Sequence, residues 1–385
     1  MTAAQSSAAS LRLRPGRRVV FTELGEDPQD ALDNFLKIEE QPAPDSAQCK
    51  PDEVIVRIES SAVSWIDLVM ASGQYQHRCY PPYIPGVEYS GVVEWTGSGV
   101  DPRQIAVGDK VLSDFIACGP RAKTAYQGAG GFAGYAVVPA SALCRIPERL
   151  NFDQAANLLA SYETAYHCII TRGQVQAGET VLIHGASGAS GLAAVQICRM
   201  LGANVIATGR SDEKLSLVKS HGANHVINTR GTDYASGVKS FREEVKALTE
   251  GRGVDAVYDA VGGDVSLESL RCVAFGARFL IVGWTSTPNV ADGKGRRGSP
   301  RANMLPTNLI QMKSLTVMGC PAVITVERSP QLREPRKSHI LEWAAAGKIT
   351  PYVSRKFSMS EAREALRSRW DGSAAGGVAL RPWEA

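Results

Sequence analysis

Three glycines spaced three residues apart follow a short apolar run in the middle of the chain, and this pattern could bind phosphate. Val181 to Ile183 predict a buried strand, and residues 192–201 predict a helix. A strand, a glycine turn and a helix N-terminus present backbone N–H groups to a pyrophosphate, and a Cβ in the turn would block its approach. We therefore predict a dinucleotide site on Gly185, Ala186, Ser187, Gly188, Ala189, Ser190 and Gly191. A glycine turn that serves tight packing alone is the alternative.

The residues after the next predicted strand, 204–209, indicate which dinucleotide is bound. A site that prefers NAD usually carries a carboxylate here for the ribose 2′-hydroxyl. This chain instead has Arg210 and Ser211, with Lys214 shortly after. Without a carboxylate a 2′-phosphate is not repelled, and Arg210 supplies a charged, planar fork for it. NADPH is therefore the predicted cofactor, and a solvated loop cation is the alternative interpretation of Arg210.

Length and composition fit an enzyme of two or three domain-sized units. The chain has 385 residues and a net charge of +3, which is too small to indicate a nucleic-acid partner. The sequence has no run of 18 apolar residues, so we predict no membrane span. The eight cysteines form no Cys-x-x-Cys pair and suggest reduced thiols in the cytoplasm. Residues 1–16, rich in Ala and Ser, are expected to form a disordered tail, with organelle targeting by this tail as the alternative.

Elements that would position these residues alternate along the chain. Residues 19–147 are β-rich, whereas helices and strands alternate from about residue 152. Predicted helices are Asp153–Thr171, Asp212–His221, Tyr234–Thr249, Ser338–Gly347 and Ser360–Ser368; predicted strands include residues 226–227, 256–258 and 278–282. From about Met318 the chain is expected to return to irregular structure. Alternation of this kind predicts a parallel sheet with helices on both faces.

Several motifs resemble the zinc-independent quinone oxidoreductase branch of the medium-chain dehydrogenase/reductase superfamily, from about residue 17 to the C-terminus. They are Val63-Ser64-Trp65-Ile66-Asp67, Pro85-Gly86-Val87-Glu88-Tyr89-Ser90-Gly91, Val107-Gly108-Asp109-Lys110-Val111, Gly131-Phe132-Ala133-Gly134-Tyr135-Ala136, Thr164-Ala165-Tyr166, the glycine turn and residues 222–228. The resemblance implies an α/β fold in which a GroES-like β-rich catalytic domain, residues 17–150 and 318–385, is split around a doubly wound Rossmann domain, residues 151–317. It also implies a homodimer.

The same resemblance bears on the reaction. Zinc-dependent relatives have a Cys and a His-Glu pair where this chain has Ser64 and Val87-Glu88, so a three-ligand zinc site cannot form. We therefore expect hydride transfer from NADPH to an electron-poor acceptor, a quinone or an α,β-unsaturated carbonyl. Ser64, Tyr75 and ordered water are candidate donors to the developing oxyanion. Asp67 is expected to have either a structural hydrogen-bonding role or a catalytic one.

The resemblance also implies further cofactor contacts. Thr164 would lie beside the nicotinamide, although an ordinary helix-interior threonine is the alternative. Val261, Gly283 and Trp284 follow predicted strands, and ligands collect at the carboxyl ends of a parallel sheet. Loop 116–130 is long. Either its Lys123 or Tyr126 contacts the substrate, or the loop is simply exposed to solvent.

Two other functions stay open at this level. An enoyl-thioester reductase would use the same chemistry on a substrate with a phosphopantetheine arm, and the basic run Lys294–Arg301 is the only sign of it. A non-catalytic NADPH-binding scaffold is the other, because fold alone does not fix function. The departures from relatives at Ser64, where quinone reductases commonly carry Asn, and at Val69 weaken the expectation of quinone specificity and leave the scaffold open.

Overall fold

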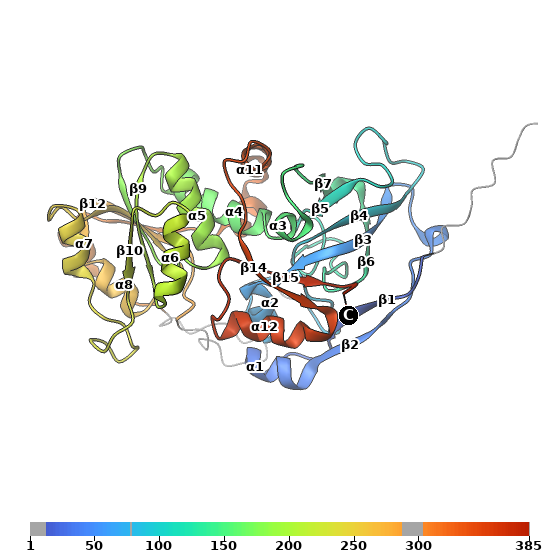
Figure 1. The fold of residues 1–385 in the computed structure, drawn as a ribbon, viewed down its shortest axis with the longest axis horizontal. Coiled ribbons are helices and arrows are strands. Elements are labelled where there is room, and N and C mark those ends of the chain that lie inside the picture. Colours follow the sequence, from blue (N-terminus) through green and yellow to red (C-terminus); the bar gives the residue numbers. More distant parts are fainter. Residues whose placement is uncertain (1–12, 78, 287–302, 385) are drawn as a thin grey trace, which may run out of the picture.

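A six-stranded parallel sheet forms one end of the molecule in the computed structural model, which describes residues 13–77, 79–286 and 303–384 (Figure 1). Its strand order is β10-β9-β8-β11-β12-β13. The strands are β8 (Thr180–Ile183), β9 (Asn204–Gly209), β10 (His225–Asn228), β11 (Val254–Asp259), β12 (Val273–Ile281) and β13 (Thr316–Gly319). Helices α5 (Ala189–Met200), α6 (Asp212–Ser220), α7 (Arg242–Leu248), α8 (Asp264–Ser269) and α9 (Thr307–Met312) connect them.

Both faces of this sheet are covered, because successive side chains of a strand point to opposite faces. Val181 and Ile183 pack with α4 (Leu159–Tyr166) and α5 in one apolar cluster, whereas Leu182 between them packs with residues of α7 in another. The doubly wound arrangement predicted from the alternating elements is therefore confirmed.

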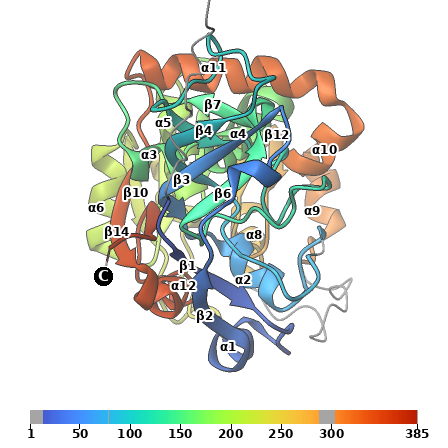
Figure 2. The same ribbon diagram turned by 90° about the vertical axis from the view of Figure 1, so that its right-hand side faces the viewer.

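A seven-stranded sheet and a hairpin form the other end, which Figure 2 turns toward the viewer. The sheet contains β3 (Glu53–Ala62), β4 (Tyr89–Thr96), β5 (Lys110–Ser113), β6 (Tyr135–Pro139), β7 (Leu143–Arg145), β14 (Val353–Ser358) and β15 (Gly377–Arg381), and the hairpin pairs β1 (Gly16–Phe21) with β2 (Leu36–Gln41). Helices α1 (Pro28–Asp30), α2 (Trp65–Ala71) and α12 (Ala362–Trp370) belong to this end. Since β14 and β15 come from the C-terminal segment, the chain leaves this GroES-like unit and returns to it.

The segments near the junction differ from the sequence prediction in their boundaries. The single helix expected over 153–171 is divided into α3 (Phe152–Ala156), α4 and a π-helical segment, His167–Arg172. The helix expected from Tyr234 begins only at Arg242, because the preceding residues form a turn closed by a bridge between Arg230 and Val238. Helices α10 (Ala322–Arg328) and α11 (Arg333–Ala345) precede the return of the chain.

Strand pairing and a ring contact extend across two of the expected domain limits. A boundary after residue 317 would cut β13, which pairs along its whole length with β12; the chain joins the other sheet only at β14. The N-terminal tail ends before residue 16, because Gly16 pairs with Gln41 and the Arg14 guanidinium lies 4.8 Å from the Trp383 ring centroid. No helix of the described chain is long and apolar enough to cross a bilayer.

Candidate functional site

The glycine turn brings bare backbone to the carboxyl edge of the parallel sheet. Gly185 has a φ of +62°, which only glycine adopts readily, and Gly188 begins α5 with no side-chain cap. A Cβ on Gly191 would lie 2.3 Å from the Gly185 carbonyl oxygen, so glycine is required there for the helix to pack on the turn. The first N–H groups of an uncapped helix have no intrahelical acceptor and are suited to bind phosphate oxygens. The turn therefore fits a pyrophosphate.

The ends of β11 and β12 meet the glycine turn. The Val261 side chain lies 3.4 Å from the position of a Cβ on Gly185. Buried Asp259 shapes this edge, because its carboxylate accepts the N–H groups of Val261 and Gly262, both at 2.9 Å. The Asp259 carbonyl accepts the N–H of Gly283 at 3.2 Å. One aspartate thus holds the residues after both strands in place.

Trp284 lies beside Gly262, which follows β11. Its Cβ is 3.1 Å from the position of a Cβ on Gly262, which has a φ of +78°. Its side chain is 48% exposed. The glycine turn, Val261, Gly283 and Trp284 therefore lie together at one edge of the sheet.

A group of cations lies where β9 ends. Arg210 is exposed, and the Ser211 hydroxyl caps α6 by accepting the Lys214 N–H at 3.4 Å. The Lys214 ammonium donates to the Gly372 carbonyl, and burial lowers the pKa of Lys214. Arg355 on β14 also acts electrostatically on Lys214 and lowers its pKa further, although nearby Asp371 opposes this. Such a cluster is suited to a 2′-phosphate.

A C-terminal segment covers the glycine turn from the other domain. The Gly376 N–H donates to the Ser187 carbonyl at 2.7 Å. Arg369 on α12 then donates to the carbonyls of Gly376, at 2.7 Å, and Val63, at 2.8 Å. Residues that are far apart in sequence therefore connect the cofactor edge with the start of α2.

Ser64 and Asp67 at the start of α2 form a capping box. The Ser64 hydroxyl donates to the Asp67 carboxylate at 2.7 Å, and the Ser64 and Gly86 N–H groups donate to it at 2.8 and 2.9 Å. Burial raises the pKa of Asp67, whereas these hydrogen bonds and Arg369 favour its charged form. The Ser64 hydroxyl, one of the predicted donors, is therefore bonded to Asp67 at the start of α2.

Tyr75 and Thr164 differ in their environments. The Tyr75 ring lies 5.5 Å from that of His77, and burial raises the pKa of Tyr75 while the charge of Arg121 opposes this shift. The Thr164 hydroxyl donates to the Ala160 carbonyl at 2.7 Å, as in an ordinary helix interior, and keeps its lone pairs as acceptors.

A buried charge network joins the two domains next to Thr164. Glu163 accepts hydrogen bonds from Arg333 at 2.9 Å and from Arg336 at 2.8 Å, and Arg333 also contacts Asp114 at 2.7 Å. Because two arginines and two carboxylates meet there, the network fixes α11 against α4.

Glu88 lies outside this network of ion pairs. Its carboxylate accepts the Ala160 N–H at 2.8 Å. Burial, together with the charge on Glu163, raises the pKa of Glu88 to about 8. Its carboxyl group is therefore largely protonated at neutral pH.

The described ranges contain no group of three or more His, Cys, Asp or Glu side chains that could hold a metal ion. The Ser64 hydroxyl is bonded to Asp67, and Glu88 faces the backbone of α4. Of the other predicted features, Lys123 pairs with Glu327 at 2.7 Å. The basic run Lys294–Arg301 lies outside the described residues.

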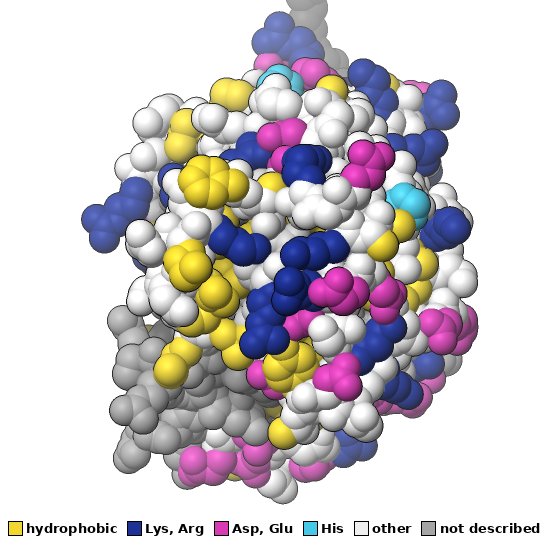
Figure 3. Space-filling model, turned by 90° about the vertical axis from the view of Figure 1, so that its left-hand side faces the viewer, with side chains coloured by type: hydrophobic (Ala, Val, Ile, Leu, Met, Phe, Trp, Pro, Cys, Tyr) yellow, Lys and Arg dark blue, Asp and Glu magenta, His cyan; other side chains and the backbone are white. Residues whose placement is uncertain are grey.

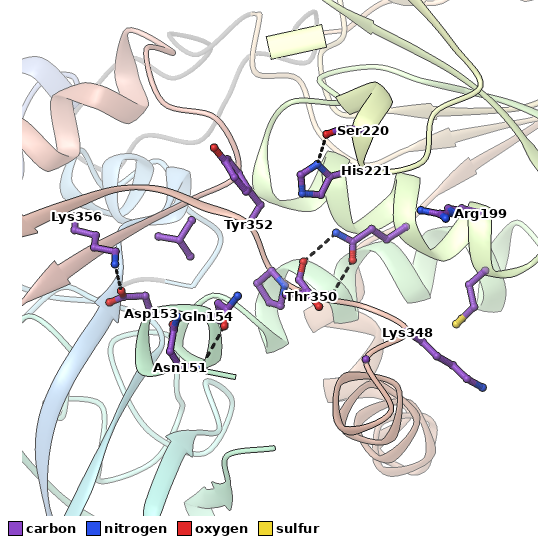
Figure 4. Close-up of a pocket in the computed structure, with 15 residues that line it drawn as sticks. Asn151, Asp153, Gln154, Arg199, Ser220, His221, Lys348, Thr350, Tyr352 and Lys356 are labelled. Carbon is purple, nitrogen blue, oxygen red and sulfur yellow. Dashed lines mark hydrogen bonds and ion pairs between the residues drawn. The ribbon is translucent and has the colours of Figure 1, made fainter. Parts of the chain in front are cut away.

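A cavity of about 750 Å³ lies elsewhere, where the chain crosses between the domains (Figure 4). Its lining comes from the C-terminal ends of α5 and α6, the start of α3 and residues 347–356. The glycine turn is at the opposite end of α5, so this cavity is separate from the turn. Gln196 and Thr350 bond each other twice across it, both at 2.9 Å, and Lys356 pairs with Asp153 at 3.2 Å.

Several residues of the site were not predicted from the sequence. Arg355, Arg369 and Gly376 come from a segment far along the chain, and no local motif marks them. Glu88 lies in one of the motifs given above, but the sequence does not show that its side chain is buried.

Comparisons with known proteins agree with this architecture. The family described as alcohol dehydrogenase GroES-like domain matches residues 50–148, and the zinc-binding dehydrogenase family matches residues 189–334. A quinone oxidoreductase-like protein 2 homolog of Nematostella vectensis is 33% identical over 82% of this chain and 78% of its own length. The human quinone oxidoreductase is 28% identical over 85% of this chain and 88% of its own length.

A solved structure of a mycobacterial protein complexed with NADPH is also similar. It has a TM-score of 0.74 and 26% identity, and the match covers 95% of this chain and 100% of that one. A probable oxidoreductase from Mycobacterium abscessus has a TM-score of 0.75 and 26% identity, with coverage of 96% and 99%.

Proposed function

Because the chain belongs to the medium-chain dehydrogenase/reductase superfamily, in its quinone oxidoreductase branch, we propose that it is an NADPH-dependent reductase of quinones or α,β-unsaturated carbonyls. One observation carries the proposal: a bare glycine turn at the carboxyl edge of the sheet continues into a group of cations at the end of β9. The first part fits a pyrophosphate and the second fits a 2′-phosphate. The relatives named quinone oxidoreductase and the NADPH complex of a similar protein support it.

The residues of this chain bind and orient the reactants. The first turn of α5 would hold the pyrophosphate, and Arg210, Lys214 and Arg355 would hold the 2′-phosphate. NADPH, when bound, supplies a hydride. The Tyr75 hydroxyl would donate a hydrogen bond to the acceptor oxygen as negative charge develops on it. Trp284 would exclude water from one side.

The reaction is proposed to proceed without zinc. The Ser64 hydroxyl and the Glu88 carboxyl each have a protein partner, and a hydroxyl is a poor zinc ligand. An acceptor whose carbonyl is already conjugated needs no Lewis acid for hydride addition, which supports a quinone or an enone.

The test is NADPH oxidation, followed by absorbance, with 1,4-benzoquinone, pent-3-en-2-one and crotonyl-CoA as acceptors. We expect turnover of the quinone or the enone, and an Arg210→Glu variant should lose about 10- to 100-fold in kcat/KM with NADPH but less with NADH. Arg103→Glu, at an exposed loop arginine, is the matched control. Exclusive turnover of crotonyl-CoA would favour the enoyl-thioester reductase, and NADPH binding without any turnover would favour the scaffold.

We also propose a homodimer joined along β13. This strand is the edge of the parallel sheet, and an unpaired edge can accept a second strand. Exposed Phe275 on β12 and Met312 just before β13 add apolar surface nearby. Figure 3 shows this end of the molecule, where hydrophobic side chains gather beside Lys and Arg. The eight free cysteines support a reducing, cytoplasmic location.

A further inference from the structure

Arg121 is a buried cation that no carboxylate neutralises in the described chain. It lies in the segment between β5 and β6 and is only 7% exposed. Its guanidinium carbon lies 5.0 Å from the Phe115 ring centroid and 5.5 Å from that of Tyr75. Its Nε has no hydrogen-bond partner, and none of the ion pairs within residues 13–77, 79–286 and 303–384 includes it.

The acids around Arg121 are already engaged. Glu163 is held by Arg333 and Arg336, and Glu327 by Lys123. Glu88 influences Arg121 only at a distance and, with a pKa of about 8, is largely protonated at neutral pH. Burying a charge is costly unless it is paired, and contact with two aromatic rings offsets only part of that cost.

The position of Arg121 places it in the acceptor region. It touches Tyr75, the proposed donor to the acceptor oxygen. The charge of Arg121 also acts on Glu88, whose carboxylate is bonded to Ala160, one helical turn before Thr164. A group bound by Arg121 would therefore lie near Tyr75.

We propose that Arg121 determines substrate specificity by binding a carboxylate, so that the natural acceptor is a conjugated carbonyl or quinone that carries a carboxylate. A guanidinium matches a carboxylate through two parallel hydrogen bonds, and a substrate carboxylate would supply the missing counter-charge. This inference rests on the proposed reductase function. Lys123 and Tyr126 of the same loop do not serve this purpose, because they pair with Glu327 and Glu53.

The experiment compares 4-oxopent-2-enoate with its uncharged amide as acceptors for NADPH oxidation. The parent protein should prefer the carboxylate by about 10- to 100-fold in kcat/KM. Arg121→Gln should lose this preference, mainly through KM for the carboxylate, and Arg121→Lys should keep part of it. Arg103→Gln is the matched control and should keep it in full.

A parent protein that reduces both acceptors equally well would overturn the inference. An Arg121→Gln variant whose kcat/KM falls by the same factor with both acceptors would also overturn it. The parent comparison needs no variant, so it decides the matter even if Arg121→Gln does not fold. If neither acceptor nor benzoquinone is reduced, the proposed function fails instead. Calorimetric titration of 4-oxopentanoate into the protein with NADP⁺ gives a second measurement, in which Arg121→Gln should bind at least about 10-fold more weakly.

Discussion

Replacing Glu88 by glutamine should remove a pH dependence from the stability of this protein. Glu88 is 4% exposed, and burial is the largest cause that raises its pKa to about 8. In the unfolded chain its pKa returns to the ordinary value of 4.5. At a pH between these two pKa values, the Glu88 carboxyl is ionised in the unfolded chain but stays protonated in the folded protein. The parent protein therefore loses stability as the pH rises from about 4.5 to 8, and the loss is complete above 8.

The magnitude follows from that interval. Each pH unit is worth about 1.4 kcal/mol, so a rise from pH 5.5 to 8 costs about 3 kcal/mol. An unfolding entropy of about 2.1 cal/mol/K per residue gives about 0.8 kcal/mol/K for 385 residues. The corresponding shift in Tm is about 4 °C.

Calorimetric scans at pH 5.5, 6.5, 7.5 and 8.5 of the parent and Glu88→Gln provide the assay. The Tm of Glu88→Gln minus that of the parent should grow by about 4 °C between pH 5.5 and 8 and then level off. Glu148→Gln, at an exposed glutamate of the same domain, is the control and should give a constant difference. A difference for Glu88→Gln that is also constant, or that shrinks as the pH rises, would refute the reasoning.

Three further predictions concern the cofactor, the acceptor and the assembly. Gly191→Ala should weaken NADPH binding by at least about 10-fold in a fluorescence titration, because its Cβ would lie 2.3 Å from the Gly185 oxygen; unchanged affinity would contradict the geometry of the turn. Tyr75→Phe should lower kcat by about 10-fold with little change in KM, since it removes a donor used in the transition state; equal rates would exclude that role. Met312→Glu should shift the protein toward monomer in sedimentation, because Met312 is 70% exposed beside the edge strand, and an unchanged dimer would place the interface elsewhere.

The cofactor half of the site could largely be predicted from the sequence, because its signals are local. The strand, the glycine turn and the helix lie within about twenty consecutive residues, and each has its own pattern. Arg210 follows the next strand at the expected spacing. These features depend on backbone conformation near each residue, which local sequence patterns indicate directly.

The acceptor half could not be predicted in the same way. Ser64 has the right residue type for a donor, but only its hydrogen bond to Asp67 shows where its proton goes. Arg121 lies in a loop whose sequence does not mark it, and its guanidinium packs on Phe115 and Tyr75. Burial and hydrogen-bond direction are tertiary properties, so residue type and spacing leave them undetermined.

The C-terminal segment links these two halves. Gly376 bonds to Ser187 in the glycine turn, and Arg369 bonds to both Gly376 and Val63, which directly precedes the capping box of α2. Arg369 is also close enough to Asp67 to act on its charge. The backbone that would hold the pyrophosphate is therefore tied, through one arginine, to α2, the helix that precedes Tyr75. Since Arg355 adds a cation beside Lys214 at the end of β9, an isolated Rossmann segment would lack both this cation and the cover over its glycine turn.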